Sequence, residues 1–259
     1  MNAIVICGGT PRPDDPLYSE ALGRPKALID VAGKPMAQWV LEAVDQADRV
    51  ERLVIIGLGP ESGLTSTKLA RFIPDHGGLL TNVMTGMSAL REIDPGQTLG
   101  LLVSSDVPTI TADMIEWRVQ IALEADADLD YAIVERSVME ARFPESRRSY
   151  IRLKGLEVCG GDVNAVRLAL AADEQLWNRI TAARKNAFKQ ASLLGLDTLL
   201  LLASRQLSLE RAERMVSKRL KLNGRAHLCP FAEIAMDVDK PHQLEWIRRD
   251  FEARRAHAH

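Results

Sequence analysis

Three aspartates in two distant segments have the character of ligands for a hard cation. Asp106 follows the apolar run LGLLVSS, and Asp237 and Asp239 stand in the C-terminal segment AMDVDKPHQLE. Carboxylate oxygens are the ligands that Mg²⁺ prefers in proteins, together with water or substrate phosphates. The two-residue spacing predicts that Asp237 and Asp239 lie on one side of a strand, so all three carboxylates can converge on one ion. A capping role for Asp239 at the last helix is the alternative.

A loop suited to phosphate follows the first apolar run. Glycines there let backbone N–H groups approach an anion closely. The segment beyond them adds side-chain cations, and arginine in particular matches the geometry of phosphate oxygens. The loop residues are Cys7, Gly8, Gly9 and Thr10, and the cations are Arg12, Arg24, Lys26 and Lys34. On composition alone, a solvated loop whose glycines only make a tight turn is the alternative.

Two common nucleotide-binding motifs do not fit the chain. It contains no GxxxxGK[ST] sequence, which argues against the mechanism of the NTPases that carry this loop. Gly57, Gly59 and Gly63 resemble a dinucleotide fingerprint, but the third glycine comes one residue late. Pro60 also stands where the fingerprint helix should begin, so a Rossmann-type dehydrogenase is not expected.

Short apolar runs at 3–7, 53–57 and 99–104 alternate with amphipathic stretches. Continuous apolar strands between helices are typical of a parallel sheet covered on both faces, so the sequence predicts an α/β fold. One helix is predicted from Pro35 to about Ala47, and another begins after Thr111. The apolar stripe of this second helix contains Ile115, Val119 and Leu123.

The pattern changes to long helical stretches from about Val163 to Leu222, with Ser208 as a helix cap. A last helix opens at Pro241. Because no low-complexity linker separates these parts, we predict one domain with a helical subdomain at about 160–225.

The composition is that of an ordinary globular protein. The 259 residues include 33 Lys and Arg against 35 Asp and Glu, a formal net charge of −2, and 46% are apolar. No global basic field is available to hold nucleic acid or an anionic membrane. No apolar run reaches the ~18 residues of a membrane span, and the opening MNAIVICGG lacks the basic segment of a signal peptide. We expect a cytoplasmic location and reduced thiols at Cys7, Cys159 and Cys229.

Taken together, the motifs resemble those of the nucleotidyltransferases with a GT-A-like fold. The GG loop with Arg12, the run RPKALIDVAGKPM, the strand end SSDVP and the tail MDVDKPHQLE stand in the order and spacing of that superfamily. More narrowly, the chain is similar to the MobA-like NTP transferases, kin to molybdenum-cofactor, sugar-1-phosphate and methylerythritol-phosphate nucleotidyltransferases. The resemblance covers about residues 1–110 and resumes near 230–250.

This resemblance implies a Rossmann-like GT-A-type fold, with a mostly parallel central sheet flanked by helices, as a single nucleotidyltransferase domain over residues 1–259. It implies transfer of an NMP from an NTP to a phosphorylated small-molecule acceptor, with Mg²⁺ or Mn²⁺ as cofactor and pyrophosphate as product. The subdomain at about 160–225 would contact the acceptor or form a lid. A phosphate monoester nucleophile needs no histidine base, because its second pKa is about 6.

Residue by residue, the resemblance assigns a triphosphate loop, a catalytic pair and a metal site. Gly8, Gly9 and Arg12 belong to the loop around the triphosphate, with Cys7 and Thr10 beside them. Lys26 matches the signature lysine that stabilises the reacting α-phosphate, and Arg12 acts with it in catalysis. Asp106 matches the metal aspartate at a strand end, and Asp237 and Asp239 match a second metal-binding element.

The same resemblance places base and ribose contacts at Gly78 and Asn82. The sequence departs from the family pattern at the glycine loop, where the usual GGxGxRM is replaced by the longer GGTPRPDDPLYSEALGRPK. This departure leaves open whether Arg24 shares the role of Arg12.

The acceptor is expected near a second glycine pair, where Gly161, Asp162 and Asn164 stand in VCGGDVNAVR. A turn that leads into a helix at Val163, with Asp162 as its cap, is the alternative. Lys185 is a further candidate because it shares a helix face with Lys189, although most such pairs are solvated.

Two rival functions remain at this stage. A GT-A glycosyltransferase normally carries DxD at the strand end, whereas this chain has SSDVP there and DVD only in the tail. An inactive nucleotide-binding homologue should have lost the cation or carboxylate positions, yet Lys26 and Asp106 are both present. The sequence does not identify the NTP or the acceptor. It also leaves open whether the chain forms a homo-oligomer.

Overall fold

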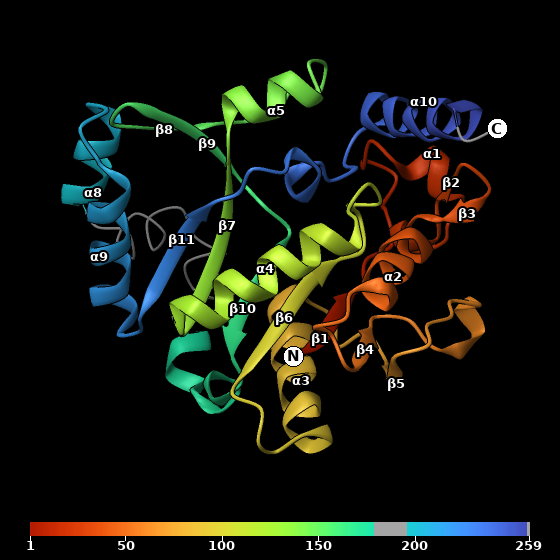
Figure 1. The fold of residues 1–259 in the computed structure, drawn as a ribbon, viewed down its shortest axis with the longest axis horizontal. Helices are drawn as coiled ribbons and strands as arrows, with labels where there is room; N and C mark the ends of the chain where they lie inside the picture. The colour runs from red at the N-terminus through yellow and green to blue at the C-terminus, as the bar shows by residue number, and fades with distance from the viewer. Residues whose placement is uncertain (179–195, 258–259) are drawn as a thin grey trace.

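One mixed sheet forms the centre of the molecule (Figure 1). The computed structural model describes residues 1–178 and 196–257. Within these residues the sheet has nine strands in the order β5-β4-β1-β6-β10-β7-β9-β8, with β11 beside β7. The strands are β1 (Asn2–Ile6), β4 (Leu53–Ile56), β5 (Leu69–Ile73), β6 (Leu99–Ser104), β7 (Leu129–Glu135), β8 (Ile151–Leu153), β9 (Leu156–Gly160), β10 (Val163–Arg167) and β11 (Gly224–Leu228).

The direction of the strands confirms the expected α/β class with a mostly parallel sheet. β1 pairs in parallel with β4 and β6, and β4 pairs in parallel with β5. β10 is antiparallel to both β6 and β7, and β9 is antiparallel to β7 and β8. Therefore β9 and β10 run opposite to the common direction of the other strands in this sheet.

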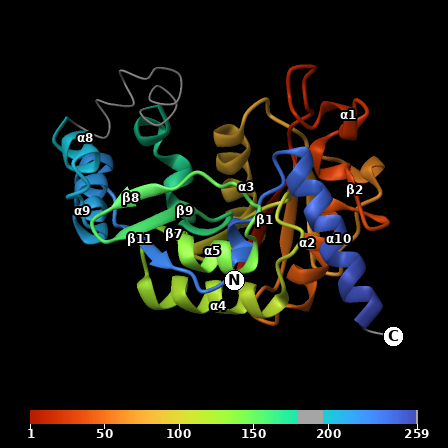
Figure 2. The ribbon, with the colours of Figure 1, turned by 90° about the horizontal axis from the view of Figure 1, so that it is seen from above.

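Helices cover both faces of the sheet, as Figure 2 shows. α2, α4 and α10 pack on one face and α3 on the other, while α8 and α9 pack beside β7, β8 and β9. The described helices are α1 (Tyr18–Ala21), α2 (Met36–Gln46), α3 (Leu79–Ile93), α4 (Ala112–Ala125), α5 (Arg136–Arg142), α8 (Leu196–Ala203), α9 (Leu209–Leu220) and α10 (Pro241–His257). The short strands β2 (Asp30–Val31) and β3 (Lys34–Pro35) form a separate hairpin before α2.

The apolar strands divide their side chains between two cores. Ala3 and Val5 of β1 join the cluster under α2 and α4, whereas Ile4 joins the cluster under α3. The alternation follows from the two-residue period of a strand. A strand buried on both faces needs apolar residues at every position, which explains the uninterrupted runs seen in the sequence.

The order of the strands places a topological switch point at the end of β1. The chain adds β4 and β5 on one side of β1 and then returns to place β6 on the other side. Ile6 pairs with Ser104, and the Ser105 N–H donates to the carbonyl of Ile6 at 3.1 Å. The loops after β1 and β6 therefore leave the sheet side by side, at the kind of switch point where α/β sheets bind ligands.

Several local predictions are confirmed. α2 and α4 occupy the expected ranges, Ser208 caps α9 by accepting from the Arg211 N–H, and α10 begins at Pro241. The three cysteines are free and buried. No helix in the described ranges is both long and apolar enough to span a membrane.

Other local predictions are wrong. Val163 begins strand β10, not a helix, because Val163, Ala165 and Val166 are buried in the sheet between β6 and β7. Hence the helical part does not begin near residue 160; within the described chain, the α-helical residues of this segment are 174–178 and those of α8 and α9. Leu123 does not belong to the buried stripe of α4, since its side chain is 52% exposed.

Gly57 brings the end of β4 against the loop that follows β1. Its φ is +102°, and an added Cβ would lie 2.3 Å from the amide nitrogen of Gly8 and 2.4 Å from its Cα. Backbone atoms cannot move aside as a flexible side chain can. The close approach of these two loops therefore requires glycine at this position.

We predict that Gly57→Ala lowers the free energy of unfolding far more than Gly63→Ala. Gly63 also has a positive φ, +72°, but an added Cβ there would meet nothing within 4 Å. Gly63→Ala should cost about 1 kcal/mol for the left-handed backbone, and Gly57→Ala about 2 kcal/mol more for the steric contact. Urea denaturation of both variants measures the difference. Equal losses would show that Gly8 has room to move.

Candidate active site

The ammonium group of Lys26 lies between two carboxylates, beside the loops that follow β1 and β6. Its Nζ is 2.6 Å from Oδ2 of Asp106 and 2.5 Å from Oδ1 of Asp239. These residues are far apart in sequence, so only the fold unites them. Because both oxygens contact one nitrogen, the two carboxylates converge on a single point that holds positive charge.

Each of the three groups is positioned by a different element. Lys26 opens a 3₁₀ turn, and its N–H donates to the Gly9 carbonyl at 3.0 Å. Asp106 follows β6, where the Ser104 hydroxyl donates to its Oδ1 at 2.6 Å. Asp239 precedes α10, and the Val238 N–H binds the Asp106 carbonyl at 2.9 Å. The chain ahead of α10 is therefore anchored to the loop after β6.

The site is shielded on one side and open on the other. The side chains of Lys26 and Asp106 are 21% and 18% exposed, whereas that of Asp239 is 56% exposed. Burial alone would lower the pKa of Lys26, but the attraction of Asp106 and Asp239 outweighs it and raises the pKa above its usual value. Lys26 therefore stays protonated near neutral pH.

Asp162 is the third acidic group near this centre. Its carbonyl accepts from the Ser104 N–H at 2.9 Å, which places it beside the end of β6. Burial and the charge of Asp106 raise the pKa of Asp162 to about 7, while Arg148 acts in the opposite direction. The position predicted to contact the acceptor thus lies close to the Lys26 centre.

Asp237 does not join Asp239. The segment between the 3₁₀ turn at Ala232–Ala235 and α10 is not a strand, so the two-residue rule does not place both aspartates on one side. Asp237 instead forms an ion pair with Arg148. The carboxylate of Asp239 contacts Lys26, and in the part of the chain that the structure describes no backbone N–H of α10 donates to it. This geometry favours the ligand role of Asp239 over the capping role.

The glycine loop lies directly beside Lys26. Gly9 has a φ of +104°, which suits glycine, and its carbonyl fixes the Lys26 backbone. Arg12 and Arg24 are exposed, and neither forms an ion pair with any described residue, so both are free to bind an anion. Thr10 is exposed in the same loop.

Cys7 lies below this loop rather than in it. Its side chain is fully buried in the core, and burial raises the pKa of its thiol to about 12. Therefore the thiol is neutral, and only the backbone of Cys7 can face a ligand.

Gly78 and Asn82 lie at the start of α3, across from the glycine loop. Gly78 precedes the first residue of α3, and its carbonyl accepts from the Asn82 N–H at 2.9 Å. The Asn82 amide donates to Asp75 at 2.8 Å and accepts from the His76 N–H at 2.9 Å. Its nitrogen is 3.0 Å from where a Cβ on Gly8 would lie, so it packs against the loop.

Two other residues predicted to contact the acceptor form hydrogen bonds and packing contacts within the sheet. Asn164 accepts from the Ala132 N–H at 2.8 Å and donates to the Gly161 carbonyl at 2.9 Å. Gly161 is buried against Ile234 and Ala132. Lys185 lies outside the described residues.

The family model of the MobA-like NTP transferase domain matches residues 3–187. The chain belongs to this family. The matched range contains Lys26, Asp106 and Asp162, whereas Asp239 comes from the C-terminal segment beyond it. No curated protein matches the chain.

Solved structures place the MobA-like chain among nucleotidyltransferase folds. A hypothetical transferase from Thermus thermophilus is 31% identical, with a TM-score of 0.78 over 94% of this chain and 100% of that one. A CMP:2-keto-3-deoxy-manno-octonic acid synthetase complexed with CTP is 16% identical, with a TM-score of 0.59 over 98% and 99% of the two chains. The 2-C-methyl-D-erythritol 4-phosphate cytidylyltransferase from Thermus thermophilus is 12% identical, with a TM-score of 0.54 over 96% and 98%.

Two carboxylates of this MobA-like site fit a divalent cation. Asp106 and Asp239 converge on one point, and the cation already there is the Lys26 ammonium. The described ranges hold no group of three His, Cys, Asp or Glu side chains arranged for a metal, because Asp237 is turned toward Arg148. Two protein carboxylates are a normal complement for Mg²⁺, which keeps waters and substrate phosphates as its other ligands.

Sequence reasoning missed Ser104 and Arg148. Ser104 orients Asp106, and the SSD sequence offers a weak signal for it, a hydroxyl two residues before a carboxylate. Arg148 neutralises Asp237, and the only signal is an arginine pair in a loop. Nothing in the linear sequence connects that loop to the tail.

We predict that Lys26→Met strengthens binding of free Mn²⁺ in the absence of nucleotide. The lysine competes for the same two carboxylates, so its removal should raise the affinity at least about tenfold, the equivalent of about 1.4 kcal/mol. Electron paramagnetic resonance of unbound Mn²⁺ measures the change. Lys34→Met is the control, because Lys34 pairs with Glu42 on α2. An affinity that is unchanged or weaker in Lys26→Met would refute the competition.

Proposed function

We propose that this MobA-like chain transfers an NMP from an NTP to a phosphorylated small-molecule acceptor and releases pyrophosphate. The observation that carries the proposal is the Lys26 ammonium held between Asp106 and Asp239 beside the Gly9 loop. A cation next to two carboxylates, at the switch point of an α/β sheet, suits a reaction in which phosphate charge must be held and moved.

The relatives support the same class of reaction. The family is one of nucleotidyltransferases, and two of the similar structures are a synthetase complexed with CTP and a cytidylyltransferase. CTP is therefore the first nucleotide to test. The cytoplasmic location predicted from the sequence stays a prediction.

The glycine loop and the cations near it would contact different parts of the triphosphate. Backbone N–H groups at Gly8 and Gly9, with the free guanidinium groups of Arg12 and Arg24, would hold the β- and γ-phosphates. Lys26 would move from its carboxylates to the α-phosphate, where it neutralises the charge that develops in the transition state. The side of the loop near Gly78 and Asn82 would receive the base and ribose.

The carboxylates released by Lys26 would then hold the cofactor. Bound at Asp106 and Asp239, Mg²⁺ or Mn²⁺ supplies charge neutralisation and orients phosphate oxygens. Asp162 would lie on the acceptor side of the centre, with Gly161 and Asn164 shaping the sheet beside it. Lys185 is retained as an acceptor contact from the sequence alone. A phosphate acceptor carries its own negative charge, so no side chain has to remove a proton from it.

A pyrophosphate-release screen tests this proposal. CTP, GTP, ATP and UTP are each offered with a panel of phosphorylated alditols, sugar 1-phosphates and phosphorylated cofactors, with Mg²⁺ and with EDTA. We expect one NTP and one class of acceptor to give metal-dependent turnover. Release from no combination, or turnover that survives EDTA, would refute the proposed function.

We predict that Asp239→Asn weakens metal-dependent turnover whereas Asp237→Asn does not change the metal requirement. Loss of one carboxylate charge at the convergence point should raise the Mg²⁺ concentration for half-maximal activity at least about tenfold. Asp237 is the matched control, because it lies two residues away and pairs with Arg148 instead. Melting curves check that both variants fold. The reverse order of effects would return Asp239 to a purely structural role.

A further inference from the structure

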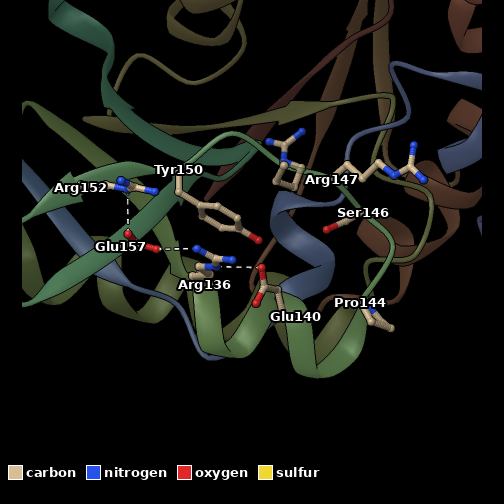
Figure 3. A pocket seen from close by; sticks show the side chains of 9 residues that line it. Arg136, Glu140, Pro144, Ser146, Arg147, Tyr150, Arg152 and Glu157 are labelled. Carbon is tan, nitrogen blue, oxygen red and sulfur yellow. Dashed lines mark hydrogen bonds and ion pairs between the residues drawn. The ribbon is translucent and has the colours of Figure 1, made fainter.

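A polar cavity of about 410 Å³ lies between α5 and the strands β8 and β9. Arg136 and Glu140 of α5 form one wall, and Arg152 and Glu157 on β8 and β9 form another (Figure 3). The loop that joins α5 to β8 supplies the remaining lining. Neither the family match nor the sequence motifs assign a role to this cavity.

The charges of the cavity do not balance. Arg136 binds Glu140 at 2.7 Å and Glu157 at 2.9 Å, and Arg152 binds Glu157 at 2.9 Å. Both glutamates are thereby engaged by these two arginines. Arg147 and Arg148, on the adjoining loop, add two further positive charges to the lining.

Arg147 is exposed and forms no ion pair or hydrogen bond with any described residue. Its φ of +50° is unusual for a residue other than glycine. Such backbone conformations cost about 1 kcal/mol or more, and they gather at binding sites. The Arg147 guanidinium is thus available to an anion from outside the chain.

One buried hydroxyl of the cavity lining lacks a close hydrogen-bond partner among the described residues. The Tyr150 hydroxyl is directed into the cavity in Figure 3 with the Ser146 hydroxyl as a neighbour, and it forms no close hydrogen bond within the described chain. An unsatisfied buried donor is unfavourable, and a bound acceptor group would supply the hydrogen bond that this hydroxyl lacks.

Arg148 connects the cavity with the Lys26 centre. It lines the cavity, and it also forms the ion pair with Asp237, two residues before Asp239. Its charge also acts on the buried carboxyl of Asp162. Arg148 is therefore shared by the cavity and by the acidic groups beside the Lys26 centre.

We infer that this cavity binds a second acidic group of the acceptor, a carboxylate or a second phosphate, through Arg147, Arg148 and the Tyr150 hydroxyl. The inference rests on the proposed function, since it takes the reacting phosphate of the acceptor to lie at the Lys26 centre. An anionic group suits the cavity because four arginines line it against two glutamates that are already paired, and the Arg147 guanidinium has no partner among the described residues. The acceptor is thus at least doubly acidic.

Arginine labelling with phenylglyoxal, read for each residue by peptide mass spectrometry, tests the inference on the full chain. The probes are malonate and inorganic phosphate, each compared with sodium chloride at equal ionic strength. Three arginines report separately: Arg147 for the cavity, Arg12 for the triphosphate loop, and exposed Arg91 on α3 as the control. The four NTPs with Mg²⁺ are tested in parallel samples.

We expect malonate or phosphate to slow the labelling of Arg147 at least about fivefold at saturation, with Arg91 unaffected. The stronger of the two probes tells whether the acidic group is a carboxylate or a phosphate. In Tyr150→Phe, which keeps the ring and loses the hydroxyl, the protection of Arg147 should require a higher probe concentration.

Labelling of Arg147 at the same rate in probe and in chloride would overturn the inference. Protection of Arg147 that is unchanged in Tyr150→Phe would remove the hydroxyl from the site and refute the assignment as stated. Failure of the proposed function looks different, because in that case no NTP protects Arg12, whatever happens at Arg147.

Discussion

The placement of one ammonium group between two carboxylates organises the rest of this structure. Asp106 and Asp239 come from distant segments of the chain, and like charges so close together would repel each other strongly without the cation between them. Lys26 supplies that cation and is tied to the glycine loop through its own N–H. The same residue that neutralises the two carboxylates therefore also holds the glycine loop beside them.

The sheet makes this contact available by its strand order. β1 is flanked by β4 and β6, so the loops that follow β1 and β6 open side by side. Gly57 lets the end of β4 pack against Gly8 in the loop that follows β1. The segment ahead of α10 is held beside the loop after β6 by the hydrogen bond from the Val238 N–H to the Asp106 carbonyl. Three ordinary backbone constraints thus position three charged side chains.

A second layer of charge surrounds this centre. Arg148 neutralises Asp237 and faces Asp162, whose pKa is raised by burial and by Asp106. Beyond it the arginines of the polar cavity outnumber the glutamates. Arg148 is therefore shared by the acidic groups beside the Lys26 centre and by the polar cavity, and the inferred second acidic group of the acceptor rests on this connection.

The sequence by itself determined the fold class and most of the central site, because these depend on local patterns. Doubly buried strands require apolar runs, and Lys26 and Asp106 stand in motifs of recognisable order. Long-range contacts decided the rest. Val163 has neighbours that suit a helix, yet its burial between β6 and β7 makes it a strand. Asp237 and Asp239 are of the same residue type and stand two positions apart. Asp237 nevertheless pairs with Arg148, whereas Asp239 pairs with Lys26. Side-chain pairing across the chain is set by three-dimensional distance, which residue spacing alone does not encode.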